Sequence, residues 1–296
     1  EVATSSITAG GGERWEGGGV QTYARDGLVF DVRDHAPEGA ARGVVMCLHG
    51  FPQDSRAWDA VAPRLTAAGL RVLAPDQRGY SPGARPPGRA AYVLPELVAD
   101  VLALADAAGA GEFHLVGHDW GGVVAWALAA QHPGRVLSAT VLSTPHPAAL
   151  RGSVLRSTQA LRSTYVAGFQ VPSLPERLLL ARSGAALRAL LVRSGLPQDL
   201  ADGYARRMAE PGALSAALGW YRALPLRRGR TGPVAVPVTY LHGRDDPSFS
   251  PVAVRATAAH VRGEFSEAEL PGGHWLPERA PGAVADAVLR GVRRTA

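Results

Sequence analysis

Short apolar runs of strand length alternate, over most of the chain, with longer stretches whose apolar residues recur at helical spacing. The predicted strands cover 44–48, 71–75, 113–116, 139–142, 238–241 and 264–270. The predicted helices cover 57–68, 94–108, 123–131, 252–261 and 281–293. Strands that are apolar throughout and alternate with helices predict an α/β fold, in which a parallel sheet is covered by helices on both faces.

The start of the chain follows a different pattern. The glycine-rich stretch 1–19 has no periodicity and is predicted to be a flexible lead-in. Two short runs, 20–23 and 28–32, then flank Asp26-Gly27, a favourable pair for a tight turn. We therefore predict a β-hairpin directly after the lead-in.

The alternation of strands and helices stops between 145 and 230. The helical stretches 157–169, 176–193, 198–209 and 213–224 fall in this segment, and none of its runs reads as a strand. An all-helical insertion in an α/β domain is typical of a cap that covers the active site of the domain. The predicted domains are a core of 20–144 and 231–296 and a helical cap of 145–230.

Composition and charge narrow the class of protein. The chain has 31 arginines, no lysine and 26 acidic residues, so its formal charge is +5. The arginines are interpreted as scattered among acids without a basic stripe, so no nucleic-acid partner is predicted. The single cysteine, Cys47, lies in an apolar run and is expected to be a small core residue.

The sequence also bears on location. No apolar stretch has the length of a membrane span, so no membrane partner is expected. The chain shows no signal peptide, and it begins at Glu1 rather than Met, which leaves a removed leader open. A cytoplasmic enzyme without a cofactor is the expectation.

The turn between the strand 113–116 and the helix 123–131 is the main candidate for chemistry. It reads Gly117-His118-Asp119-Trp120-Gly121-Gly122, which has the spacing of the nucleophile elbow of the α/β-hydrolases, with Asp119 at the nucleophile position. A carboxylate nucleophile suits attack on an sp³ carbon, as in opening an epoxide or displacing a halide. Water can then cleave the resulting ester.

An acid and a histidine are expected after later strands, in that order along the chain. Asp246 follows the strand 238–241 and His274 follows the strand 264–270. Asp246 would orient His274, and His274 would activate water. Asp245 is the alternative acid, but Asp246 is preferred.

Five motifs together resemble the soluble epoxide hydrolase family, from about Val20 to the C-terminus. They are His49-Gly50-Phe51-Pro52, Asp76-Gln77-Arg78-Gly79-Tyr80-Ser81, the Asp119 turn, the Gly243-x-x-Asp246 turn and Gly273-His274-Trp275. The resemblance implies an eight-stranded, mostly parallel sheet with an inserted cap. It also implies that a small apolar epoxide and water are the substrates, that the product is a vicinal diol, and that no cofactor or metal is required.

The resemblance extends to residues that would assist the reaction. Trp220-Tyr221-Arg222 and the segment from Tyr165 to Gln170 match two family segments that each supply a cap tyrosine. Tyr165 and Tyr221 would then act as acids toward the epoxide oxygen. The backbone N–H groups of Phe51 and Trp120 would form an oxyanion hole, and the Phe51–Pro52 bond resembles one that is cis in the family.

Two other functions share the triad or the fold. A haloalkane dehalogenase has the same nucleophile, acid and histidine, but often has Asn after His-Gly where this chain has Phe51. A non-catalytic ligand-binding protein is disfavoured because all three triad positions are filled. The residues are compatible with a detoxifying or a biosynthetic role, with several epoxides and stereochemistries, and with a monomer or a homodimer.

Overall fold

The computed structural model describes residues 19–226 and 230–295, so the predicted lead-in lies, except for Gly19, outside the described residues. Eight strands form one sheet in the order β1-β2-β4-β3-β5-β6-β7-β8. Their bounds are β1 Thr22–Arg25, β2 Leu28–His35, β3 Val44–Leu48, β4 Arg71–Pro75, β5 Phe113–His118, β6 Val136–Leu142, β7 Val238–Gly243 and β8 Phe265–Leu270. β1 and β2 pair antiparallel, as do β2 and β4, and every other pair is parallel. The predicted fold class is confirmed.

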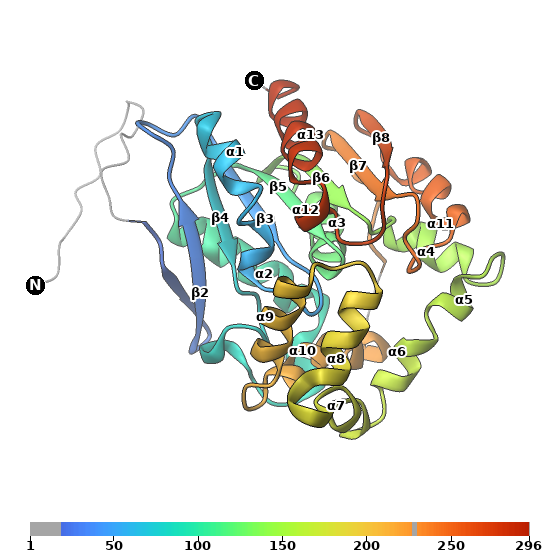
Figure 1. Cartoon of the computed structure of the whole chain (residues 1–296). Helices are drawn as coiled ribbons and strands as arrows, with labels where there is room; N and C mark the ends of the chain where they lie inside the picture. The colour runs from blue at the N-terminus through green and yellow to red at the C-terminus, as the bar shows by residue number, and fades with distance from the viewer. Residues whose placement is uncertain (1–18, 227–229, 296) are drawn as a thin grey trace, which may run out of the picture.

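Helices cover both faces of the sheet (Figure 1). Packed on one face are α1 (Ala62–Ala67) and α13 (Pro281–Arg293), and on the other α2 (Leu94–Ala107) and α3 (Trp120–Gln131). The central strands are therefore buried on both sides. In β3, for example, Cys47 packs into the core under α1 and α13, whereas Met46 packs into the core under α2 and α3. Burial raises the pKa of the Cys47 thiol.

The regular structure described between 147 and 226 is helical throughout. It comprises α4 Pro147–Ser153, α5 Gln159–Arg162, α6 Thr164–Phe169, α7 Leu174–Leu179, α8 Ala181–Arg193, α9 Gln198–Met208 and α10 Ala213–Arg222. In Figure 1, α6 to α10 lie together at one end of the sheet. The boundaries of a cap domain at 145 and 230 stay a prediction.

Prolines and left-handed backbone conformations explain why several helices are shorter than predicted. The predicted helix 57–68 is a 3₁₀ turn, Ser55–Trp58, followed by α1, whose first turn contains Pro63. Proline has no N–H to donate, so it fits the start of a helix better than its interior. The predicted helix 176–193 is α7 and α8, and α8 itself bends where Arg182, Ser183 and Gly184 all adopt a left-handed φ.

Other boundaries differ by a few residues. The strand predicted at 139–142 begins at Val136, and the helix predicted at 123–131 begins at Trp120. The predicted helix 157–169 is divided into α5 and α6, and 252–261 is reduced to α11 (Pro251–Ala256) and a 3₁₀ turn. The sequence pattern did not indicate α4 or α12 (Leu276–Arg279), each too short to show a helical period.

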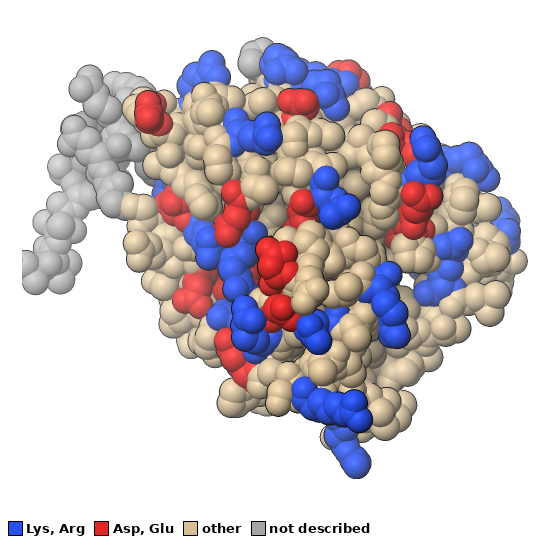
Figure 2. All heavy atoms as spheres, in the orientation of Figure 1, with Lys and Arg blue, Asp and Glu red and all other residues tan. Residues whose placement is uncertain are grey.

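Arginines and acids are interspersed over much of the face in Figure 2. Within 19–226 and 230–295, none of the helices is both long and apolar enough to cross a membrane.

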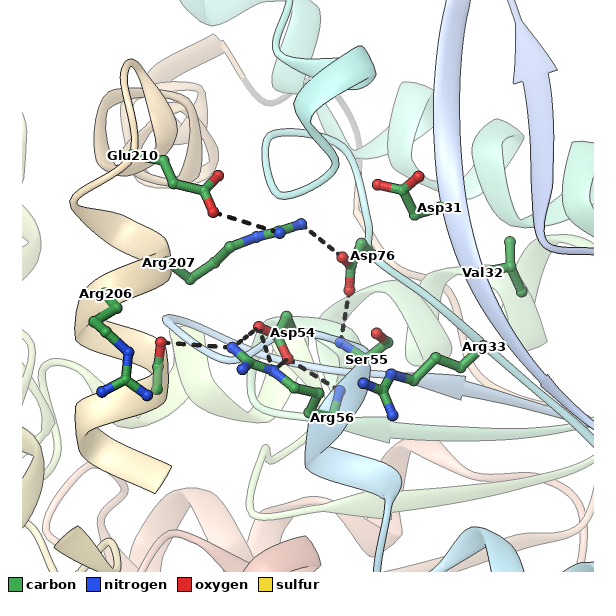
Figure 3. Close-up of a pocket in the computed structure, with 11 residues that line it drawn as sticks. Asp31, Val32, Arg33, Asp54, Ser55, Arg56, Asp76, Arg206, Arg207 and Glu210 are labelled. Carbon is green, nitrogen blue, oxygen red and sulfur yellow. Dashed lines mark hydrogen bonds and ion pairs between the residues drawn. The ribbon is translucent and has the colours of Figure 1, made fainter. Parts of the chain in front are cut away.

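A charged cavity of about 520 Å³ separates α9 from the core (Figure 3). Arg207 on α9 lies 2.8 Å from the carboxylate of Asp76, the residue after β4. Across the cavity Arg56 pairs with Asp54 at 2.6 Å and donates to the carbonyl oxygen of Gly203 on α9 at 3.5 Å. These contacts neutralise charges within the cavity and attach α9 to the core.

Candidate active site

Asp119 lies at the sharp turn between β5 and α3. Its φ of 52° and ψ of −117° are unfavourable for a residue with a side chain. Two glycines make the turn possible. A Cβ at Gly117 would lie 2.3 Å from the carbonyl oxygen of Gly121, and a Cβ at Gly121 would lie 2.1 Å from that of Leu48. The elbow spacing is thus a steric requirement of this turn.

The carboxylate of Asp119 meets the loop that follows β3. Its Oδ1 atom accepts a hydrogen bond of 2.8 Å from the backbone N–H of Phe51. A Cβ at Gly50 would lie 2.4 Å from the Cβ of Asp119, so only glycine allows this approach. The Phe51–Pro52 peptide bond is cis. Thr144 supports the turn from the other side by donating to the backbone oxygen of Asp119 at 2.8 Å.

His274 is buried between the two carboxylates. Its Nδ1 atom lies 2.8 Å from Oδ2 of Asp246, and its Nε2 atom lies 3.6 Å from Oδ2 of Asp119. Asp246 is fixed by a hydrogen bond of 2.8 Å from the N–H of Ser248 to its Oδ1 atom. Asp245 is exposed and makes no side-chain contact with His274 that we find. The structure thus brings together the three residues that were predicted to form a triad.

The charges of this cluster depend on one another. Burial alone would lower the pKa of the His274 imidazole, but the charges of Asp246 and Asp119 outweigh burial and raise it to about 10. Burial opposes ionisation of Asp119, but His274 and the Phe51 N–H hold its pKa below the ordinary value. Burial likewise opposes ionisation of Asp246, and His274 again lowers its pKa. These shifts favour ionised carboxylates and a protonated imidazole in the resting site.

Two tyrosines from the helical segment face the Asp119 side chain across a cavity. Tyr221 on α10 is buried, Tyr165 on α6 is 44% exposed, and their ring centroids are 6.0 Å apart. Desolvation, together with the negative charge of Asp119, raises the pKa of both phenols. Both therefore keep their protons. The ring of Trp120 packs edge-on against Tyr221, with centroids 5.0 Å apart.

Helix α10 is held in place by contacts on both sides of Tyr221. The Nε1 atom of Trp220 donates to the backbone oxygen of Arg78 at 2.7 Å, which attaches α10 to the core. The side-chain amide of Gln170 donates to the backbone oxygen of Tyr221 at 2.8 Å, which ties α10 to the end of α6. The two tyrosines therefore have a defined separation.

The cavity that contains these groups has a volume of about 610 Å³, within the range of small-molecule sites. Its polar groups include Asp119, Tyr165 and Tyr221. The rest of its wall is mainly apolar, and includes Val123, Pro145, Pro147, Leu150, Val154, Val166, Leu224 and Phe249. Such a wall suits an apolar substrate.

Sequence reasoning missed three polar residues beneath the triad. The Gln53 Oε1 atom accepts from the N–H of Gly50 at 2.8 Å and lies 2.8 Å from Nδ1 of His118. The other ring nitrogen of His118 lies 2.8 Å from the backbone oxygen of His274. Gln53 follows one recognised motif and His118 lies within another, but nothing in their spacing indicates that they meet.

Glu278 extends this network toward α9. Its Oε1 atom accepts hydrogen bonds from Gln53 at 2.6 Å and from the hydroxyl of Tyr204 at 3.1 Å. Its Oε2 atom is buried without a hydrogen-bond partner. Burial raises the pKa of Glu278 to about 7. Glu278 lies in the short helix α12, and nothing in the sequence around it indicates that its carboxyl group is buried.

Among the described residues, no group of three or more His, Cys, Asp or Glu side chains is arranged to hold a metal ion.

Comparisons with known proteins identify the family of this chain. A family model for the α/β hydrolase fold matches residues 43–281. Epoxide hydrolase A of Mycobacterium tuberculosis (strain ATCC 25618 / H37Rv) is 32% identical, over 89% of this chain and 94% of that protein. The AB hydrolase superfamily protein YfhM of Bacillus subtilis (strain 168) is 32% identical, over 83% of this chain and 88% of that protein.

A solved structure points the same way. It belongs to a study of novel epoxide hydrolases in metagenomes from hot environments, and it matches with a TM-score of 0.78 and 29% identity. The match covers 92% of this chain and 97% of that one. The chain therefore belongs to the α/β-hydrolases and, within them, to the epoxide hydrolase family.

Proposed function

We propose that this protein hydrolyses a small apolar epoxide to a vicinal diol, through an ester of the substrate with Asp119. The observation that carries the proposal is the position of Asp119. Its ionised carboxylate lies between the Phe51 N–H and His274, and the cavity above it also holds two protonated tyrosines. A nucleophile and proton donors on one cavity suit the opening of an epoxide ring.

In the first half-reaction, Tyr165 and Tyr221 donate hydrogen bonds to the epoxide oxygen. Asp119 attacks a ring carbon, the C–O bond breaks, and the departing oxygen takes a proton from a tyrosine. The product is a hydroxyalkyl ester of Asp119. Asp119 needs no base for this step, because it is already ionised.

Ester formation changes the proton affinity of His274. The negative charge of Asp119, one of the causes that raise the pKa of His274, disappears when the ester forms. His274 can then give its proton to the tyrosinate and become a neutral base. Asp246 keeps the imidazole oriented through the 2.8 Å contact with Nδ1.

In the second half-reaction, His274 removes a proton from water, and the hydroxide attacks the carboxyl carbon of Asp119. The backbone N–H groups of Phe51 and Trp120 stabilise the oxyanion. When the intermediate collapses, the second proton of that water goes to the departing alkoxide. The diol leaves, and Asp119 and protonated His274 are restored.

The test of the ester is a single turnover in ¹⁸O water with enzyme in excess over a styrene-oxide-like epoxide. We expect the label in the peptide that contains Asp119, because the attacking water supplies one of the restored carboxylate oxygens. Label only in the diol would overturn the ester mechanism.

A second assay separates epoxide hydrolysis from dehalogenation. We expect turnover of the epoxide and no halide release from haloalkanes of similar size. The reverse result would support the haloalkane dehalogenase that shares this triad.

A further inference from the structure

The positive charge of the chain is concentrated in one segment of the helical region. Residues 147–193 contain seven arginines and one acid, a formal charge of +6, whereas the whole chain carries +5. The arginines are Arg151, Arg156, Arg162, Arg177, Arg182, Arg188 and Arg193. They are therefore less evenly scattered among acids than the sequence analysis inferred, and the remainder of the chain is nearly neutral.

Most of these arginines are free to act on a partner. Six of the seven are exposed, and Arg162 is partly buried. Arg188 lies 3.5 Å from Asp202, the one ion pair that we find for the seven. The single acid of the segment, Glu176, pairs instead with Arg222 at 2.6 Å. Over α6 and α7, Figure 2 shows tan and blue atoms and no red ones.

The same segment holds nearly all the large apolar side chains that are exposed in the described residues. Outside it, Val29 alone belongs to this group. Within it they are Leu155, Leu161, Tyr165, Val171, Leu174, Leu178, Leu190 and Val192. Leu155 is 96% exposed, Leu161 73% and Leu178 59%. Apolar side chains of this size, gathered on α5 to α8 and the turns beside them, mark an interaction surface.

The segment also forms part of the wall of the reaction cavity. Leu150, Arg151, Val154, Tyr165 and Val166 all line it. Of these, Arg151 and Tyr165 are also exposed to solvent, so the cavity and the outer surface meet at α4 and α6.

We propose that residues 147–193 form a docking surface for an anionic lipid membrane. The arginines would contact the headgroups, while Leu155, Leu161 and Leu178 enter the boundary between headgroups and acyl chains. Arginines interspersed with exposed leucines on helices have the two properties required of an interfacial surface, namely charge complementarity and apolar area. This replaces the expectation of no membrane partner with a peripheral contact.

The charge pattern favours a membrane over other partners. A second copy of the chain docked through this surface would bring two surfaces of charge +6 together, which disfavours that dimer. Single-stranded nucleic acid is bound mainly by aromatic side chains that stack on bases. Here seven of the eight exposed apolar residues are aliphatic.

Docking would have a consequence for catalysis, which rests on the proposed function. An apolar epoxide partitions into a bilayer. A cavity that opens at the docked surface would receive the epoxide from the lipid without passage through water.

The binding test uses the whole protein and vesicles of two compositions, phosphatidylcholine alone and equal parts phosphatidylcholine and phosphatidylglycerol. We expect co-sedimentation with the anionic vesicles only, weakened by added salt. Replacement of three arginines outside the cavity wall, Arg156→Ser, Arg177→Ser and Arg193→Ser, should weaken binding on the order of 100-fold. Leu155→Ser with Leu161→Ser should also weaken it, and this loss should persist at high salt.

A matched variant removes the same charge elsewhere. Arg64, Arg89 and Arg290 are exposed and lie outside the segment, and their combined replacement by Ser should leave vesicle binding within about twofold of wild type, because the headgroups contact only the docking surface. Equal loss in both triple variants, or binding to an oligonucleotide in place of vesicles, would overturn the proposal.

Activity distinguishes failure of docking from failure of the proposed function. Anionic lipid should accelerate turnover of a vesicle-dissolved epoxide by wild type but not by the triple variant in the segment. Both proteins should turn over a water-soluble epoxide equally. Vesicle binding without turnover of either epoxide would refute the proposed function and leave the docking surface standing.

Discussion

The Nε2 atom of His274 lies 3.6 Å from Oδ2 of Asp119, longer than a direct hydrogen bond, while Oδ1 of Asp119 is held by the Phe51 N–H at 2.8 Å. No proton transfer from Asp119 to His274 is therefore needed before attack, although the charge of His274 helps to keep the Asp119 carboxylate ionised. The proposed task of the histidine comes later, when water must be activated beside the ester.

This geometry predicts that His274→Gln separates the two half-reactions. Ring opening should persist, because the Phe51 N–H still stabilises the ionised Asp119 carboxylate, whereas ester hydrolysis should slow by about 10²–10⁴-fold with the loss of the general base. Intact-protein mass spectrometry should then show an adduct with the mass of the substrate. In Asp119→Asn the adduct should be absent. A His274→Gln enzyme that opens epoxides slowly and carries no adduct would contradict the assignment.

The positions of Tyr165 and Tyr221 predict that their loss slows ring opening and leaves ester hydrolysis unchanged. Tyr165→Phe and Tyr221→Phe each remove one hydrogen-bond donor to the epoxide oxygen, and the double variant should lose most of the roughly 10²–10⁴-fold that general acid catalysis provides. Rapid-quench measurement of ester formation checks this. As a control, Tyr92→Phe removes a hydroxyl that donates to the Pro86 carbonyl oxygen at 2.7 Å, outside the cavity. An unchanged rate in the double variant would refute the cap assignment.

Glu278 predicts a dependence of stability on pH. Its pKa is about 7 in the folded protein and about 4.3 in an unfolded chain. Between these values the folded state binds more protons, so the free energy of unfolding falls as pH rises, by roughly 4 kcal/mol in all from this group. Glu278→Gln removes the contribution, so the variant should gain stability relative to wild type between about pH 5 and pH 8.

Urea unfolding across that pH range measures this gain. Glu112→Gln, at an exposed position, serves as the control and should track wild type. A constant difference between Glu278→Gln and wild type at every pH would show that the carboxyl group is not perturbed by folding.

A buried ion pair behind the site predicts a large loss of stability. Arg78 binds Asp100 through two contacts of 2.7 Å, and both side chains are almost fully buried. Asp100→Ala leaves a buried guanidinium without its main counter-charge, which should cost about 3–5 kcal/mol. The exposed pair of Asp106 with Arg135 is the matched control, and Asp106→Ala should cost at most about 1 kcal/mol. Thermal unfolding of the two variants compares these losses.

The parts of the fold that the sequence predicted best are those with one dominant signal. Residues 44–48 and 71–75 are apolar strands buried on both faces, and the structure has β3 and β4 with those same bounds. The elbow was recognisable because steric contacts at Gly117 and Gly121 restrict those positions to glycine. The buried strands and the elbow are both determined by residues close together in the chain, so a single sequence is enough to predict them.

The remaining features depend on contacts between distant residues. Gln53 and Glu278 are 225 positions apart and share a hydrogen bond of 2.6 Å. The kink in α8 lies at Arg182, Ser183 and Gly184, and the apolar pattern on either side of it does not mark the interruption. The docking surface combines exposed leucines with arginines that are mostly without an ion pair, and apolar periodicity alone would predict those leucines to be buried.

The Cys47 thiol allows transient opening of the protein core to be measured by chemical labelling. Cys47 is the single cysteine of the chain, it has no exposed surface, and its strand β3 lies between β4 and β5 in the sheet. A thiol-specific reagent can reach it only when the core under α1 and α13 opens, so the labelling rate measures rare opening events of the native state. Because the buried Cys47 thiol does not react in the native state, a cysteine introduced at position 155 would be the sole labelled site. A fluorophore there would report the approach of a bilayer directly.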